Sequence, residues 1–295
     1  MKRAYKQINL RDDRLAMVEQ CNTVISRYQR QGLTLTLRQL YYQLVTQNII
    51  ANKERSYKNL GNLVSDARLG GLIDWDAIED RVRVPRSSSQ WNNIAGLVES
   101  ALDSFRLPRW KGQDSYVELW VEKDAISGVL SPIADEYHVT LMVNRGYSSQ
   151  SAMHEAALRF RTEERREAGH VKQLKLLYLG DHDPSGEDMV RDIQERLLMF
   201  GANVVVEKIA LTMDQVEEYN PPPNPAKLTD TRSNAYIEKH GDESWEVDAL
   251  PPDVLHQLIE DAILGYLDLE KMDKIKEQEE EDKIALTKFA EDLGQ

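Results

Sequence analysis

Two carboxylates stand one residue apart at the end of an apolar run in the segment L-K-L-L-Y-L-G-D-H-D-P-S-G. The run from Leu174 to Leu179 stops at a glycine and is followed by Asp181 and Asp183, after which a helical pattern covers Glu187 to Phe200. Acidic side chains this close repel each other unless a cation neutralises them. Mg²⁺ suits such a pair because it prefers a few carboxylate oxygens together with water and phosphate. A polar turn that only caps the following helix is the alternative that this motif leaves open.

A further carboxylate follows another apolar run, in the segment L-W-V-E-K-D, where Glu122 comes directly after Val121. The carboxyl ends of parallel strands lie along one edge of a sheet, and ligands of open α/β sheets bind there. We therefore expect Glu122, Asp181 and Asp183 to converge on one Mg²⁺ site.

Residues 112–210 alternate apolar runs with helical patterns, which is typical of a mostly parallel sheet covered by helices on both faces. Strands are predicted at Tyr116–Val121, Val139–Asn144, Leu174–Leu179 and Asn203–Ile209, and helices at Ala125–Tyr137, Ser149–Glu167 and Glu187–Phe200. Residues 211–295 are expected to form a C-terminal extension. It would hold an extended segment at Tyr219–Pro225, a strand at Trp245–Leu250, a helix from Pro251 to Leu267 and a charged tail that is either a solvated helix or frayed.

Residues 1–111 form a different unit with three predicted helices, at Asn9–Gln31, Leu37–Gln47 and about Ser56–Leu69. Short extended segments follow, and this order is typical of a winged helix, a helix-turn-helix variant that binds DNA. The third helix would then lie in a groove of DNA, presenting Lys58, Asn59, Asn62, Ser65 and Arg68, while Arg81, Arg83 and Arg86 would contact phosphates. A plain helical domain with a solvated basic face is the alternative. The predicted fold class is α/β plus α.

Charge is distributed unevenly along the chain, whose net charge is −13. Residues 1–111 carry 18 Lys and Arg against 11 Asp and Glu, whereas residues 112–295 carry 19 against 39. A basic module in an otherwise acidic chain suggests contact with a polyanion.

Two adjacent tyrosines on the second predicted helix are distinguished by helical periodicity. Leu37, Leu40 and Tyr41 follow the spacing of a buried face, whereas Arg38 and Tyr42 are four residues apart on a more polar face. A phenol with a pKa of ~10 is a poor nucleophile at neutral pH. A neighbouring guanidinium favours the phenolate and can also bind a phosphate. Tyr42 is therefore the predicted nucleophile and Tyr41 a core residue.

The motifs together resemble a known family. They are T-L-R-Q-L-Y-Y at Thr36–Tyr42, L-W-V-E-K-D, N-R-G-Y-S-S at Asn144–Ser149, G-D-H-D-P-S-G and W-E-V-D-A-L-P-P at Trp245–Pro252. This order is similar to the A subunit of type IIB topoisomerase (topoisomerase VI) and to the meiotic double-strand-break transesterase, over most of residues 30–260. The resemblance implies a winged-helix domain followed by a Toprim domain. Ser185 stands where the family commonly has Tyr, which leaves the acidic pair intact.

The resemblance also implies an activity. Tyr42, assisted by Arg38, would cleave double-stranded DNA by transesterification at a Mg²⁺ site made by Glu122, Asp181 and Asp183, with Arg145 contacting phosphate. The family works as a homodimer in which Tyr of one protomer acts at the metal site of the other, and strand passage requires a separate ATPase subunit. A metal-dependent nuclease that uses water, and a DNA-binding module without catalysis, are the alternatives.

Some residues are expected to do no chemistry. His182 is interpreted as a solvent-facing loop residue in preference to a ligand or proton donor, and Glu187 as a first-turn helix acid. Cys21 lies on the apolar face of the first predicted helix, which indicates a core thiol and a reducing, cytoplasmic (or nucleoid-associated) setting. No apolar run approaches the ~20 residues that a membrane helix needs, so no membrane partner is expected.

Overall fold

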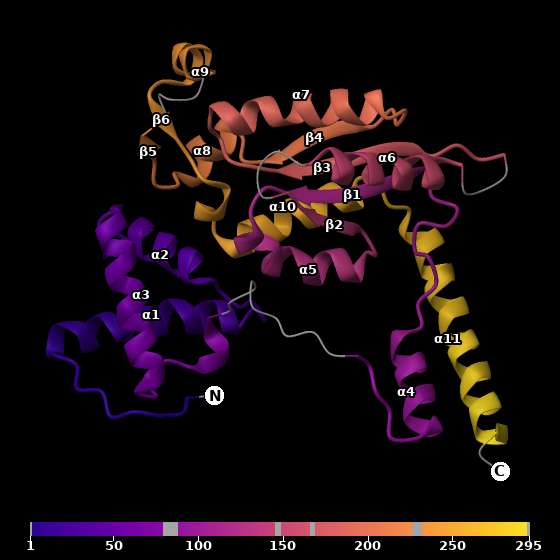
Figure 1. The fold of residues 1–295 in the computed structure, drawn as a ribbon, viewed down its shortest axis with the longest axis horizontal. Coiled ribbons are helices and arrows are strands. Elements are labelled where there is room, and N and C mark those ends of the chain that lie inside the picture. The colour runs from indigo at the N-terminus through magenta and orange to yellow at the C-terminus, as the bar shows by residue number, and fades with distance from the viewer. Residues whose placement is uncertain (1, 79–87, 145–148, 166–168, 226–231, 294–295) are drawn as a thin grey trace.

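A computed structural model describes residues 2–78, 88–144, 149–165, 169–225 and 232–293 (Figure 1). It is a mixed α/β structure in which a helical N-terminal unit lies beside a parallel sheet. Among the described residues, none of the helices has the length and apolar character needed to cross a membrane.

The N-terminal unit contains the three predicted helices, α1 (Asp12–Gln29), α2 (Leu37–Thr46) and α3 (Glu54–Leu69). Thr36 begins α2 with a capping box, because its hydroxyl accepts from the Gln39 N–H while the Gln39 side chain accepts from the Thr36 N–H. The third helix begins at Glu54, two residues before the predicted start at about Ser56. A short 3₁₀ turn (Trp75–Ala77) follows. The extended segment expected to form a wing, with Arg81, Arg83 and Arg86, lies outside the described residues.

The four predicted strands form one parallel sheet, as expected: β1 (Ser115–Val121), β2 (Thr140–Val143), β3 (Gln173–Leu179) and β4 (Val205–Ala210). Their order is β2-β1-β3-β4, so β1 and β3 are central. In the register, Val121 at the end of β1 pairs with Leu179 at the end of β3, which brings the residues after both strands to the same edge.

Helices cover both faces of the sheet (Figure 1). On one face lie α6 (Gln150–Glu164) and α7 (Pro184–Met199), and on the other α5 (Ser127–Glu136), preceded by a 3₁₀ turn (Asp124–Ile126), and α10 (Pro252–Leu264). Because side chains alternate along a strand, Tyr116 and Trp120 pack with α6 and α7, while Leu119 and Val121 pack towards α5, α10 and the N-terminal unit. The C-terminal extension thus supplies a layer of the sheet domain.

The remaining segments lie near the carboxyl edge of the sheet and in an outlying helix pair. α8 (Met213–Tyr219) leads to a small antiparallel pair of strands, β5 (Asn224–Pro225) and β6 (Glu243–Ser244), and α9 (Ser233–His240) lies between them in the sequence. Away from the sheet, α11 (Leu269–Leu293) lies alongside α4 (Ile94–Ser104) (Figure 1). Buried Glu279 anchors α11 by accepting from the Leu107 N–H and pairing with Arg109.

The strand predicted at Trp245–Leu250 is wrong, because this segment forms a 3₁₀ turn at Val247–Ala249. The Val247 N–H donates to Asp181 Oδ1 at 2.9 Å, so it is taken by a side chain and cannot enter a strand ladder. The charged tail is helical in α11, one of the two forms left open.

Candidate functional site

The three predicted metal ligands lie at the carboxyl edge of the sheet. Glu122 follows β1, and its Oε2 accepts from the Asp181 N–H at 3.3 Å and from the Tyr178 hydroxyl at 3.4 Å. Asp183 caps α7 by accepting from the Gly186 N–H at 2.7 Å. Glu122 and Asp181 are thus in contact, whereas among the described residues the three do not form a group whose ligand atoms all lie within 4.8 Å of one another.

The loop with the two aspartates is clamped to the W-E-V-D segment. His182 and Trp245 form an isolated antiparallel bridge, with the His182 N–H donating to the Trp245 carbonyl at 2.8 Å and the Trp245 N–H donating back at 3.0 Å. This pairing sets Asp181 beside Glu246. The W-E-V-D segment therefore adds two carboxylates, Glu246 and Asp248, to the edge.

A lysine ammonium lies among these carboxylates. Lys123 Nζ is 2.9 Å from Asp181 Oδ1, 2.9 Å from Glu246 Oε2 and 3.1 Å from Asp248 Oδ1. The Asp248 side chain is fully buried. A buried carboxylate needs a compensating charge, so Lys123 serves as the cation of this edge. Although burial alone would lower it, the three carboxylates raise the pKa of Lys123, which keeps the ammonium charged.

The predicted Arg38–Tyr42 pair reaches the same carboxylates from α2. The Arg38 guanidinium forms an ion pair with Glu246, and its Nε lies 2.9 Å from Asp248 Oδ2. Its Nη2 donates to the Tyr42 hydroxyl at 3.5 Å. The Tyr42 hydroxyl and the Glu246 carboxylate lie close enough for each to affect the pKa of the other. Side chains from the N-terminal unit and from the edge of the sheet therefore form one continuous polar cluster.

Both tyrosines of α2 are buried, with Tyr41 5% and Tyr42 3% exposed. The Tyr41 hydroxyl donates to Asn52 at 3.0 Å, away from the acidic edge. Arg38 favours the Tyr42 phenolate, as expected, but it is only one of the groups that affect the pKa of Tyr42. Burial, with the nearby charges of Glu246 and Asp248, raises the pKa of Tyr42 above its usual value and outweighs Arg38. In this arrangement Tyr42 is a protonated phenol.

The carboxylates of the acidic edge differ in the pKa values that their surroundings give them. Burial raises the pKa of Asp181 to about 7, and Glu122 adds to the shift while Lys123 opposes it. Burial also acts on Glu246, but Lys123 and Arg38 lower the pKa of that carboxyl to about 2. Among the described residues, the buried side-chain amide of Asn144, at the end of β2, has no hydrogen-bond partner. Crowded carboxylate oxygens are the kind of ligand that a hard divalent ion prefers.

Comparison of the chain with protein-family models and with curated proteins finds no match. A function for this chain is therefore inferred from the geometry of the site.

His182 is buried, with 2% of its surface exposed, so the interpretation as a solvent-facing loop residue is wrong. The α9 segment covers it, because Tyr236 and His240 both pack on its ring. Burial lowers the pKa of His182 to about 4. Glu187 does lie in the first turn of α7, but it also pairs with Lys208 at 2.6 Å.

The residues predicted to contact DNA are only partly described. Lys58 is exposed and pairs with Glu54 on the same helix at 2.6 Å, and Asn62 is exposed beside a surface hollow of about 800 Å³ between α1 and α3. Arg68 instead stacks over Trp75 at 4.7 Å and donates to its carbonyl. Arg145, like the arginines of the expected wing, lies outside the described residues.

Lys123, Glu246 and Asp248 are site residues that the sequence patterns did not identify. Lys123 lies inside the L-W-V-E-K-D motif, directly after the carboxylate of Glu122. The alternation E-V-D was interpreted as a strand, although two acids in an otherwise apolar run, W-E-V-D-A-L, could have been recognised as buried charges that need a partner.

Proposed function

We propose that this protein is a Mg²⁺-dependent DNA-cleaving transesterase of the topoisomerase VI A type, built on a winged-helix and a Toprim domain. The observation that carries the proposal is the contact of the Arg38–Tyr42 pair with Glu246 and Asp248, carboxylates that share Lys123 with Asp181. A nucleophile and a phosphate-binding cation beside crowded carboxylates suit phosphoryl transfer.

In the proposed reaction, the Tyr42 oxygen attacks a DNA phosphodiester and forms a new P–O bond. The bond from phosphorus to the 3′ oxygen breaks, and the phenolic proton ends on the released 3′-hydroxyl. Arg38 holds the scissile phosphate, which replaces the carboxylates as its partner. Mg²⁺ held by Glu122, Asp181 and Asp183 would neutralise charge on the phosphate and leaving oxygen.

The buried state of Tyr42 defines what DNA binding must do. The phenol becomes accessible only when α2 separates from the Glu246–Asp248 turn, and the same separation releases Arg38. In a homodimer, this would let Tyr42 of one protomer act at the carboxylates of the other. Double-stranded DNA and a second copy of the chain are the proposed partners, and a separate ATPase subunit is needed only for strand passage.

A covalent adduct tests the proposal. The protein is incubated with supercoiled DNA and Mg²⁺, denatured with detergent, and assayed for DNA-linked protein. Wild type should form the adduct, and Tyr42→Phe should form none. Tyr41→Phe is the matched control, since it removes a hydroxyl from the same helix that bonds Asn52 instead of the acidic edge, and it should form the adduct as wild type does.

A hydrolytic nuclease is the second candidate, and the burial and raised pKa of Tyr42 favour it, because water needs no activated phenol. Cleavage without an adduct, equal in wild type and Tyr42→Phe and abolished by Glu122→Gln, would replace the transesterase with this nuclease. A chain that binds DNA but cleaves none under any of these conditions would be the non-catalytic module.

A further inference from the structure

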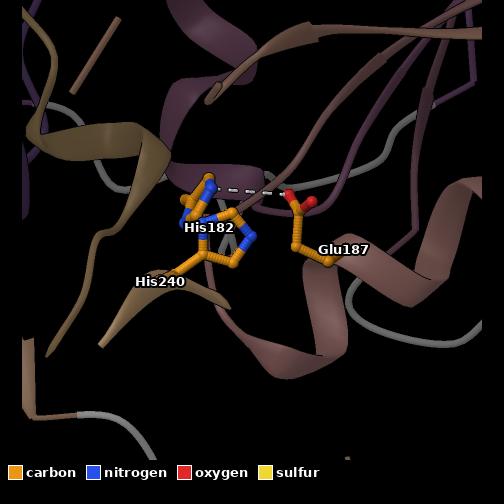
Figure 2. Close-up of side chains that lie close together, drawn as sticks. All are labelled: His182, Glu187 and His240. Carbon is orange, nitrogen blue, oxygen red and sulfur yellow. Dashed lines mark ion pairs between the residues drawn. The ribbon is translucent and has the colours of Figure 1, made fainter. Parts of the chain in front are cut away.

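A second group of ligand-type side chains lies beside the aspartate loop (Figure 2). It is formed by His182 from the loop, Glu187 from the first turn of α7 and His240 at the end of α9. In the part of the chain that the structure describes, this is the group of three His, Cys, Asp or Glu residues whose ligand atoms all lie within 4.8 Å of one another.

The spacing of these atoms is close to that of a coordination site. His182 Nε2 lies 3.8 Å from Glu187 Oε1, and the rings of His182 and His240 meet edge to face with centroids 4.7 Å apart. A tetrahedral ion with bonds of about 2.0–2.1 Å holds its ligand atoms about 3.3 Å apart. Closing the His182–Glu187 gap thus needs a movement of roughly half an ångström, which small side-chain rotations provide.

Tyr236 determines which nitrogen of His182 carries the proton. The Tyr236 hydroxyl donates its one proton to the His182 carbonyl at 2.9 Å, and its oxygen lies 2.7 Å from His182 Nδ1. Both contacts are made together when Nδ1 donates to the tyrosine oxygen, which leaves the lone pair on Nε2, the nitrogen that faces Glu187. A partner that fixes the tautomer in this way is typical of metal-ligating histidines.

We propose that His182, Glu187 and His240 bind a divalent transition-metal ion of the Zn²⁺ class, at a site separate from the proposed Mg²⁺ site. Two imidazole nitrogens and one carboxylate suit Zn²⁺, whereas Mg²⁺ prefers oxygen ligands alone. Three protein ligands leave a fourth position for water.

Lys208 limits the affinity of this site. Its Nζ lies 2.6 Å from Glu187 Oε1 and donates to the Asp181 carbonyl at 3.0 Å. His182 and Lys208 both face Oε1 of Glu187, so an ion bound by this oxygen competes with the ammonium. The ammonium repels a dication, and binding is accordingly sought at micromolar Zn²⁺.

An ion here would fasten α9 to the loop that carries Asp181 and Asp183. His182 stands between these two residues, and the W-E-V-D segment already holds it by its backbone. Because metal binding adds to the stability of the state that binds it, Zn²⁺ would hold the aspartate loop against α9 and raise the melting temperature.

Calorimetric titration of the full-length chain with Zn²⁺ tests the site. The protein is first freed of metal with a chelator and dialysed into buffer with excess Mg²⁺, which occupies the carboxylate edge. We expect one Zn²⁺ per chain, a loss of binding in His240→Ala, and about tenfold weaker binding in Tyr236→Phe. His154→Ala, a surface histidine on α6, is the matched control and should bind as wild type does.

Two further results separate this site from the proposed cleavage function. Tyr42→Phe and Glu122→Gln should bind Zn²⁺ as wild type does, because neither residue belongs to the group. Co²⁺ in place of Zn²⁺ should give visible absorption bands that are lost in His240→Ala. Absence of saturable Zn²⁺ uptake, or uptake by folded His240→Ala equal to wild type, would overturn the proposal.

Discussion

Lys123 is the cation that holds the acidic edge together, so replacing it with methionine tests how the edge is neutralised. Methionine keeps most of the apolar stem and removes the ammonium. The change leaves Asp181 without its lysine, while Glu246 and Asp248 keep Arg38. We expect Lys123→Met to be unstable without a divalent ion and to recover when Mg²⁺ is present.

The size of the effect follows from the burial of the partners. Side-chain exposure is 10% for Asp181, 24% for Glu246 and 0% for Asp248. Removing one partner of a buried ion pair costs about 3–5 kcal/mol. Because Arg38 still compensates part of the negative charge, we expect the lower end, about 3 kcal/mol. In Lys123→Met a Mg²⁺ ion can take the position that the ammonium fills in wild type. At one hundred times its Kd for this position, the ion restores about 2.7 kcal/mol to the variant alone and nearly closes the deficit.

Urea unfolding followed by tryptophan fluorescence, in EDTA and in Mg²⁺, measures this difference. Lys175→Met is the matched control, since Lys175 lies in the same sheet and pairs with Glu207 at 3.1 Å, away from the acidic edge. It should lose stability equally in both buffers. A deficit of Lys123→Met that is the same in EDTA and Mg²⁺, or an equal recovery of Lys175→Met, would refute the reasoning.

Two further predictions concern the loop and the C-terminal helix. A Cβ on Gly186 would lie 2.1 Å from the Asp181 carbonyl oxygen, so Gly186→Ala should lose about 2 kcal/mol in urea unfolding, whereas Gly265→Ala, where the nearest atom is 3.5 Å away, should lose none. Burial opposes ionisation of Glu279, but Arg109 and its other partners lower its pKa to about 2 from 4.5. The ionised Glu279 therefore stabilises the fold above pH 4.5, and this stabilisation is lost towards pH 2. Glu279→Gln should cost about 2 kcal/mol of unfolding free energy at pH 7. A deficit of this variant that did not shrink in acid would contradict the prediction.

The parallel sheet could be predicted because its strands are buried on both sides. β1 and β3 are continuous apolar runs, and the helical patterns between them require crossover connections. The same logic placed Glu122 and Asp181 at one edge, where the register indeed brings them into contact. The end of each strand is visible in the sequence as the point where an apolar run gives way to a polar residue, so it can be predicted locally.

The environment of Tyr42 could not be predicted, because it depends on residues far along the chain. Helical spacing placed Tyr41 and Tyr42 on different faces of α2, but the structure buries both, because the 3₁₀ turn after Glu246 covers the polar face of this helix. Likewise, His182 is buried only because α9 folds over it. Periodicity describes one helix at a time and contains no information on which distant segment covers its second face.

The pair of Arg38 with Glu246 joins residues 208 positions apart. During synthesis, the helix with Tyr42 is complete long before the ribosome reaches the carboxylates that enclose it. A chain that stops before residue 246 therefore carries the tyrosine and its arginine without their acidic cover. Proteolytic or translational truncation would change the state of Tyr42 without touching α2, which makes the integrity of the C-terminal third a condition for control of the N-terminal unit.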